Sequence, residues 1–420
     1  MISNFDLIAL LLTLSATFGW FNRRYLRMPH SIGLLVMGLM ASVLLILVDL
    51  AFPAQHLYGD LTRTLRRIDF TALVMDGMLA FLLFAGAINL DLRAIRARAW
   101  PIASLALIGT LISTALVGGC LWLAAGWLGM PMTLSWAMVF GALISPTDPV
   151  AVLTMLKNVD VPDILQAEMQ GEALFNDGVG VVVFTLMVSI ASSGSAAVPP
   201  GVAEVMWHVL LEVGGGLVLG AATGYVAYRA LRSIDDFAVE VLITLALVAG
   251  TYGLTQALGA SGPLAVVAAG LLVGHRAPQD AMSDHTQGYV TALWTLIDEV
   301  LNSILFLLIG LEVLVLSFDL GVVWLALAAV PIVLVGRLAA VSAPLLLRRW
   351  AVMGSISNVP FLTWAGVRGG ISVALALSLP ETEAKSVLLA ATYGVVVFSI
   401  VVQGSTLGLV ARHTVKADGR

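Results

Sequence analysis

Residues 171–190 read GEALFNDGVGVVVFTLMVSI, with a glutamate, an asparagine and an aspartate at the head of a long apolar run. A run of this length is typical of a helix that crosses a membrane. Burying an ionised carboxylate in hydrocarbon costs several kcal/mol, so Glu172 and Asp177 require a partner, a water path or a bound ion. The rest of the chain has to supply one of these.

The composition sets the class of protein. Of the 420 residues, 60% are apolar and only 11% are charged, which is too apolar for one soluble core. The apolar residues fall into blocks of roughly 20, the length that crosses about 30 Å of hydrocarbon as a helix. Strands of a membrane barrel are about half as long and alternate apolar with polar residues, unlike these blocks. The sequence therefore predicts an all-α membrane protein.

About thirteen transmembrane helices are predicted from these blocks. Their centres lie near Leu11, Met40, Leu79, Thr110, Ile144, Val181, Gly216, Leu245, Val266, Leu305, Ala328, Gly369 and Val397. The first block carries no basic residue before its apolar run, so we expect a retained helix and not a signal peptide.

The basic residues predict the orientation, because Lys and Arg concentrate in cytoplasmic loops. Fifteen of the 21 basic residues follow odd-numbered spans or lie in the tail, and four follow even-numbered spans. This asymmetry predicts that the N-terminus lies outside and the C-terminus lies in the cytoplasm. We expect a multi-pass protein of the plasma (inner) membrane. Two basic residues, Arg337 and Arg368, fall within spans.

Three pairs of spans resemble each other at a constant offset. Spans 2 and 9, 3 and 10, and 5 and 12 share local patterns, for example FLLFAGAINL (81–90) and FLLIGLEVL (306–314). An odd offset of seven spans gives the two copies opposite orientations. We therefore predict an inverted repeat of spans 1–6 and 8–13, a feature of secondary transporters.

Spans 5 and 12 are each predicted to be broken near the middle. In span 5, Pro146 and Pro149 bracket Thr147 and Asp148, and each proline removes a backbone donor and disfavours helix at the preceding residue. Span 12 contains GVRGG (366–370), with Arg368 between the glycines. The freed backbone groups should line a cavity, since lipid could not satisfy them.

Three ordered stretches carry a resemblance: SPTDPVAV (145–152), GEALFNDGVGVVVF (171–184) and GVRGGISVALALSLP (366–380). They resemble the signatures of NhaP-type sodium/proton antiporters, in the monovalent cation:proton antiporter family that also contains the animal sodium/proton exchangers. The resemblance implies an NhaA-like antiporter fold, a homodimer, and exchange of Na⁺ for H⁺ without a cofactor. It implies a dimerisation bundle (1–98 and 200–317), a core ion-transport bundle (99–193 and 320–411) and a short tail (412–420).

A hard monovalent cation prefers oxygen ligands, so Asp177 is the candidate carboxylate that holds either a proton or the cation. The resemblance makes it the transport aspartate, with Na⁺ bound by Asp177, Thr147 and Asp148. Asn176 stands where electrogenic relatives have aspartate, which implies electroneutral one-for-one exchange. Glu172 lies on the Asn176 face of the helix, about 140° from Asp177, and is expected to act through water or a side-chain network.

The chain departs from the family pattern at two positions. Ala173 replaces a hydroxyl ligand of relatives, so the shell has to be completed by Thr147, the Asp148 backbone or Ser145. Ala85 replaces a glutamate that pairs with a core arginine, so Arg368 needs another acid. Asp148 and Glu172 are the two candidates.

Other polar residues have open roles. Arg337 either holds helices together or is a functional charge. Asp148 is either an ion ligand or the cap of its own broken helix. Asp298 and Glu299 are expected at the cytoplasmic end of span 10, solvated or attracting cations to a funnel. Gly178 and Gly180 are expected to let span 5 approach closely.

Several alternative functions were weighed. A K⁺/H⁺ antiporter would use the same residues. A cation channel would conduct without proton coupling, and the broken helices argue against it. An intramembrane aspartyl protease would need paired carboxylates, and no GxGD stretch occurs. No phosphate-binding glycine loop, metalloprotease motif or basic nucleic-acid patch is present, so neither an enzyme nor a nucleic-acid partner is predicted.

Overall fold

The computed structural model describes residues 4–51, 72–148, 152, 156, 161–193, 202–312, 320–346 and 358–414. Every regular element in these ranges is a helix, which confirms the predicted all-helical class. The α-helices are α1 Asn4–Phe21, α2 His30–Ala51, α4 Leu79–Ile88, α5 Leu92–Ala97, α6 Ala99–Ser104, α7 Thr110–Trp127, α8 Leu134–Leu143, α10 Asp163–Ser192, α11 Val202–Leu231, α12 Phe237–Leu258, α13 Gly262–Asp280, α14 Asp284–Glu312, α15 Leu320–Leu346, α16 Val359–Trp364, α17 Gly370–Leu377, α18 Glu383–Phe398 and α19 Gly404–Thr414. Short π-helical segments occupy Asn22–Leu26, Ala72–Met78, Leu105–Gly109 and Ser399–Gln403.

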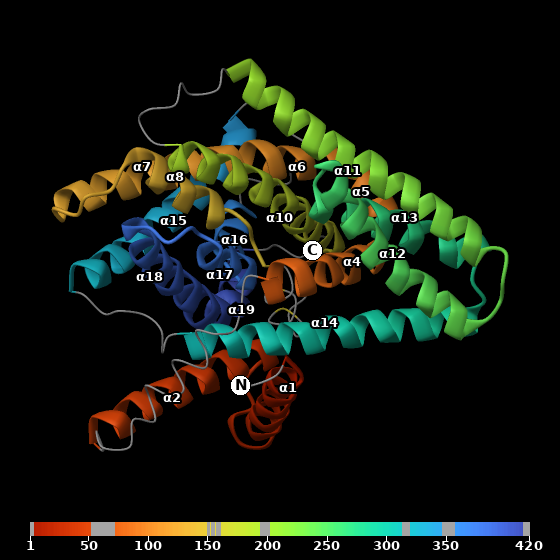
Figure 1. Cartoon of the computed structure of the whole chain (residues 1–420), viewed down its shortest axis with the longest axis horizontal. Coiled ribbons are helices and arrows are strands. Elements are labelled where there is room, and N and C mark those ends of the chain that lie inside the picture. Colours follow the sequence, from red (N-terminus) through yellow and green to blue (C-terminus); the bar gives the residue numbers. More distant parts are fainter. Residues whose placement is uncertain are drawn as a thin grey trace.

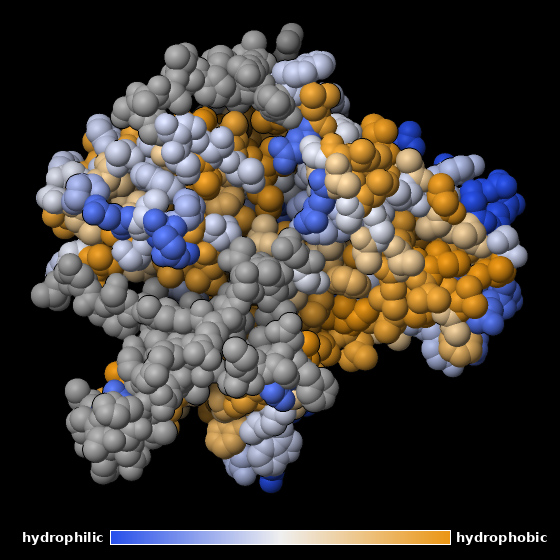
Figure 2. Space-filling view, viewed as in Figure 1, coloured by the Kyte–Doolittle hydropathy of each residue, from blue (hydrophilic) through white to orange (hydrophobic). Residues whose placement is uncertain are grey.

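Eight helical stretches of the described chain are long and apolar enough to cross a membrane. They are His30–Asp49, Ala99–Trp127, Ile164–Ser192, Val209–Leu231, Phe237–Leu258, Asp284–Leu311, Gly321–Ala343 and Glu383–Thr414. Apolar side chains also cover much of the outer surface in Figure 2, and Val218 and Val226 of α11 are 69% and 67% exposed. An apolar outer surface fits a lipid solvent. The count of thirteen crossings and the inverted repeat remain predictions.

The helices gather on two sides of α10 (Figure 1). Helices α11, α12 and α13 lie together on one side, and α15, α17 and α18 lie on the other. Helix α10 contacts both sides, through α13 and α11 and through α8 and α17. The stretch that carries Asp177 therefore sits between two helix groups.

Helix α10 begins earlier than its sequence suggests. Residues 171–177 were expected at the head of the helix, but α10 runs from Asp163, just after Pro162, to Ser192. Residues 163–170 contain neither proline nor glycine, so nothing interrupts the helix before Gly171. As a result Asp177 lies near the middle of α10.

Two glycines of α10 allow close packing, on different partners. A Cβ on Gly180 would lie 2.6 Å from Cγ of Pro146, so the prediction that Gly180 admits span 5 is confirmed. A Cβ on Gly178 would instead lie 2.5 Å from Cδ2 of Leu264 in α13. The same prediction for Gly178 is wrong, because two residues rotate the helix by about 200°.

The C-terminal helix is longer than predicted. Helix α19 ends at Thr414, so it includes residues 412–414 of the expected tail, and residues 415–420 lie outside the described residues. Pro149 also lies outside them.

Candidate functional site

Two interrupted helices meet beside α10. Helix α8 ends at Leu143, and the chain is not helical from Ser145 to Asp148. Helix α16 ends at Trp364, and α17 starts only at Gly370. The two breaks lie side by side, because the Asp148 amide donates to the carbonyl of Val367 over 2.8 Å. Both predicted interruptions are therefore present, and they cross at a backbone hydrogen bond.

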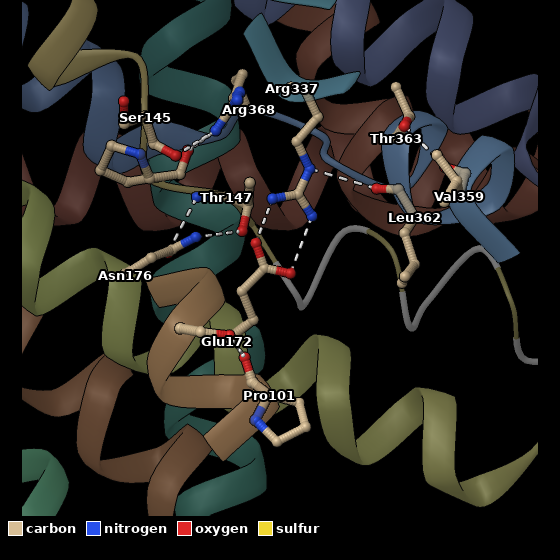
Figure 3. Close-up of polar contacts among 12 residues, drawn as sticks. Pro101, Ser145, Thr147, Glu172, Asn176, Arg337, Val359, Leu362, Thr363 and Arg368 are labelled. Atoms are coloured by element: carbon tan, nitrogen blue, oxygen red, sulfur yellow. Dashed lines mark hydrogen bonds and ion pairs between the residues drawn. The ribbon is translucent and has the colours of Figure 1, made fainter. Parts of the chain in front are cut away.

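Arg368 satisfies the carbonyls that the first break exposes. Its side chain is 1% exposed, and one guanidinium nitrogen, Nη1, donates to the carbonyls of Ser145 and, over 3.0 Å, Pro146 (Figure 3). A cation at the C-terminal end of a helix also interacts favourably with its dipole. Arg368 makes no ion pair with the described carboxylates, so the expectation that Asp148 or Glu172 pairs with it is wrong.

Glu172 pairs with Arg337 instead. Both nitrogens Nη1 and Nη2 of Arg337 donate to the Glu172 carboxylate, the second over 2.9 Å, and Nε donates to the carbonyl of Leu362 over 3.3 Å. Glu172 is 1% and Arg337 7% exposed. Arg337 therefore joins α15 to α10 and to α16, as Figure 3 shows. A Cβ on Gly366 would lie 2.6 Å from its Nε, so the glycine leaves room for the guanidinium.

Asn176 holds the first break to α10. Its Nδ2 donates to Thr147 Oγ1 over 2.9 Å, and its Oδ1 accepts from the Thr147 amide over 3.3 Å (Figure 3). Both residues are buried. The amide side chain thus fixes the unwound segment next to Asp177, and the lone pairs that remain on Thr147 Oγ1 can still face a cation.

Asp177 is the buried acid of this crossing. It is 4% exposed, and its Oδ1 has no hydrogen-bond partner. Asp148 and Arg368 are the charged groups that act on it most strongly. Such an oxygen is costly to bury ionised without a counterion. It therefore suits a group that carries either a proton or a cation.

The two remaining candidates point elsewhere. The Asp148 carboxylate lies against Gly369, the residue before α17, where a Cβ would be 2.2 Å from Oδ2. A negative charge near a helix N-terminus is favourable. The Ser145 hydroxyl donates to Gly141 over 2.7 Å and lies 3.3 Å from the Thr114 hydroxyl. Ser145 thus faces α7, and only its carbonyl belongs to the crossing.

The acids of α14 differ from the expectation. Asp298 and Glu299 were expected at a solvated helix end, but α14 runs from Asp284 to Glu312, so they lie at its middle. Asp298 is half-buried there, whereas Glu299 is exposed. Asp298 accepts from Nδ2 of Asn302 over 3.0 Å, and its carboxylate interacts electrostatically with Asp148. The sequence hides this position because the polar residues 284–287 and the acids 298–299 suggest a helix that begins later.

Glu168 was missed by the sequence reasoning. It is 3% exposed and lies 3.4 Å from Arg98. Its signal was available, since it precedes Glu172 by four residues and so shares its helix face.

Comparisons with known proteins identify the family of the chain. Residues 10–413 match the family model described as "Sodium/hydrogen exchanger, transmembrane". The chain belongs to the sodium/hydrogen exchanger family. This exchanger is 42% identical over 415 residues to the Na(+)/H(+) antiporter NhaP of Pseudomonas aeruginosa, covering 97% of this chain and 96% of that one. It is 32% identical over 391 residues to the Na(+)/H(+) antiporter NhaH of Halobacillus dabanensis, with 91% of each chain covered.

A solved structure supports the fold of the exchanger. The sodium proton antiporter MjNhaP1 from Methanocaldococcus jannaschii matches 98% of this chain and 99% of its own, with a TM-score of 0.74 and 18% identity. This likeness confirms the predicted antiporter fold. The family model and the two relatives confirm the family recognised from the three motifs.

Proposed function

We propose that this exchanger moves Na⁺ and H⁺ in opposite directions across the membrane, with both ions competing for Asp177. The observation that carries the proposal is the buried, unpartnered Oδ1 of Asp177 beside the crossing of two broken helices. Broken helices supply backbone carbonyls and helix ends to ion sites in secondary transporters. Thr147 and the backbone of Asp148 would complete the oxygen ligands, since the Asp148 carboxylate lies against Gly369, and Asn176 would hold Thr147 in place.

The charges around the site support one-for-one exchange. Glu172 and Arg337 neutralise each other, which leaves Arg368, Asp148 and Asp177 as the charges of the crossing. With Asp177 protonated these three sum to zero, and with Asp177 ionised and one Na⁺ bound they again sum to zero. The two loaded forms carry the same charge, so the exchange cycle would be insensitive to voltage.

The wider architecture is part of the same proposal. Residues 1–98 and 200–317 would form a dimerisation bundle, and residues 99–193 and 320–411 a mobile core that carries the ion. Contacts within each set support this division, for example α2 with α14 and α11 with α13, against α7 with α8 and α15 with α18. The protein would be a homodimer in the plasma membrane, with its N-terminus outside and its C-terminus in the cytoplasm.

Proteoliposomes with an imposed pH gradient test the proposal. Internal pH is followed after addition of Na⁺, Li⁺ or K⁺, with the membrane potential clamped at zero. We expect Na⁺ to collapse the gradient in the wild type and not in Asp177→Asn. Glu240→Gln is a matched control, because Glu240 is 0% exposed and both its carboxylate oxygens lack partners. Wild-type rates in Asp177→Asn would refute the assignment, and a response to K⁺ alone would favour a K⁺/H⁺ antiporter.

A further inference from the structure

A cavity of about 430 Å³ lies between α5, α10, α11 and α13. Its polar wall consists of Arg93 and Arg96 from α5 and His275 and Arg276 from α13. Its apolar wall includes Leu217, Ala268 and Leu272. The cavity therefore has two chemically different parts.

No acid in the part of the chain that the structure describes forms an ion pair with Arg93, Arg96 or Arg276. The nearby acids are engaged, since Asp91 accepts from the Arg93 backbone amide over 2.8 Å and Asp280 accepts from the Tyr228 hydroxyl over 2.7 Å. Three exposed guanidinium groups at one cavity are a fitting partner for a phosphate group.

The apolar and the basic walls of the cavity lie at different heights along α11 and α13. Gly216, Gly220 and Gly224 of α11 approach, in turn, Ser261, which caps α13, and Ala265 and Ala269 of α13, so the two helices run parallel. Leu217 is therefore level with the start of α13, whereas Arg276 lies near its end. From Ala268 to Arg276 the helix rises about 12 Å. A soluble anion would use only the basic end, but an amphiphile would use both.

We propose that this cavity binds an anionic phospholipid, with its phosphate at Arg93, Arg96 and Arg276 and an acyl chain along Leu217 and Ala268. Basic pockets between transmembrane helices on the cytoplasmic side are suited to anionic headgroups. The orientation proposed above puts Arg93, Arg96 and Arg276 on that side. Phe175, which also lines the cavity, is two residues before Asp177, so the bound lipid touches the helix that carries the candidate ion site.

Native mass spectrometry of the purified full chain tests the proposal, with phosphatidylglycerol and phosphatidylcholine of identical acyl chains as probes. We expect the wild type to retain phosphatidylglycerol preferentially. Each Arg→Gln change at 93, 96 or 276 should weaken its retention about fivefold, the effect of one basic residue at an anionic surface. The triple variant should bind the two lipids equally.

Arg229→Gln is the matched control, because Arg229 is an exposed arginine of α11 outside the cavity. Leu272→Glu is an independent variant that keeps all three arginines and should also abolish the preference for phosphatidylglycerol. An unchanged preference in the triple variant, or an equal loss in Arg229→Gln, would overturn the proposal. Complete displacement of the lipid by excess inorganic phosphate would refute a phospholipid ligand and would indicate a site for a soluble anion.

Discussion

The pair formed by Glu172 and Arg337 provides the strongest prediction of stability. Both side chains are less than 10% exposed, and two guanidinium nitrogens meet the two carboxylate oxygens. Removing one partner leaves a buried charge unpaired, which costs about 3–5 kcal/mol. Arg337→Met also leaves the carbonyl of Leu362 without its donor.

The expected result is a large loss of thermal stability in either single variant. At about 2 °C per kcal/mol, the lower end for large domains, Arg337→Met or Glu172→Leu should lower the melting temperature by about 6–10 °C in detergent. The double variant should recover much of this loss, because replacing a buried ion pair by apolar side chains is often neutral. Thermal unfolding of the four proteins gives the coupling energy directly.

Two results would refute this reasoning. One is a shift of less than about 2 °C in both single variants, which would mean that the charges find water or other partners. The other is a double variant whose loss of stability equals the sum of the losses in the two single variants, which would mean that Glu172 and Arg337 are not coupled. Transport by the double variant then separates the roles, since a stable but inactive double variant would assign Glu172 or Arg337 to ion movement.

Three further predictions concern the crossing. Thr147→Val removes the acceptor of the Asn176 amide and should raise the half-saturating Na⁺ concentration about five- to tenfold in proteoliposomes, whereas Thr147→Ser should not. Gly180→Ala should lower the free energy of unfolding by about 1–3 kcal/mol, because its Cβ would meet Pro146. Gly119→Ala is the control, since a Cβ there meets nothing within 4 Å, and an equal loss in both variants would contradict the packing. Asn176→Asp should not by itself make exchange electrogenic, and a sustained Na⁺-driven current across proteoliposomes would disprove this.

The sequence alone determined the class of the protein and the positions of its breaks. Long apolar blocks require helices in a bilayer, and proline and glycine act locally on the backbone, so both interruptions could be predicted from neighbouring residues. Asp177 could be selected for the same reason, because an acid within an apolar run is costly wherever the helix packs. The three motifs then indicated the family.

Only the tertiary structure decided which charges meet. Glu172 and Arg337 are 165 residues apart in the chain, and Arg368 binds carbonyls that exist as free acceptors only after α8 has ended. Helical periodicity assigns a residue to a face but does not say which helix covers that face, which is why Gly178 faces α13 and Gly180 faces Pro146. The partner of a buried charge depends on distances between separate segments, and those distances arise only when the helices pack.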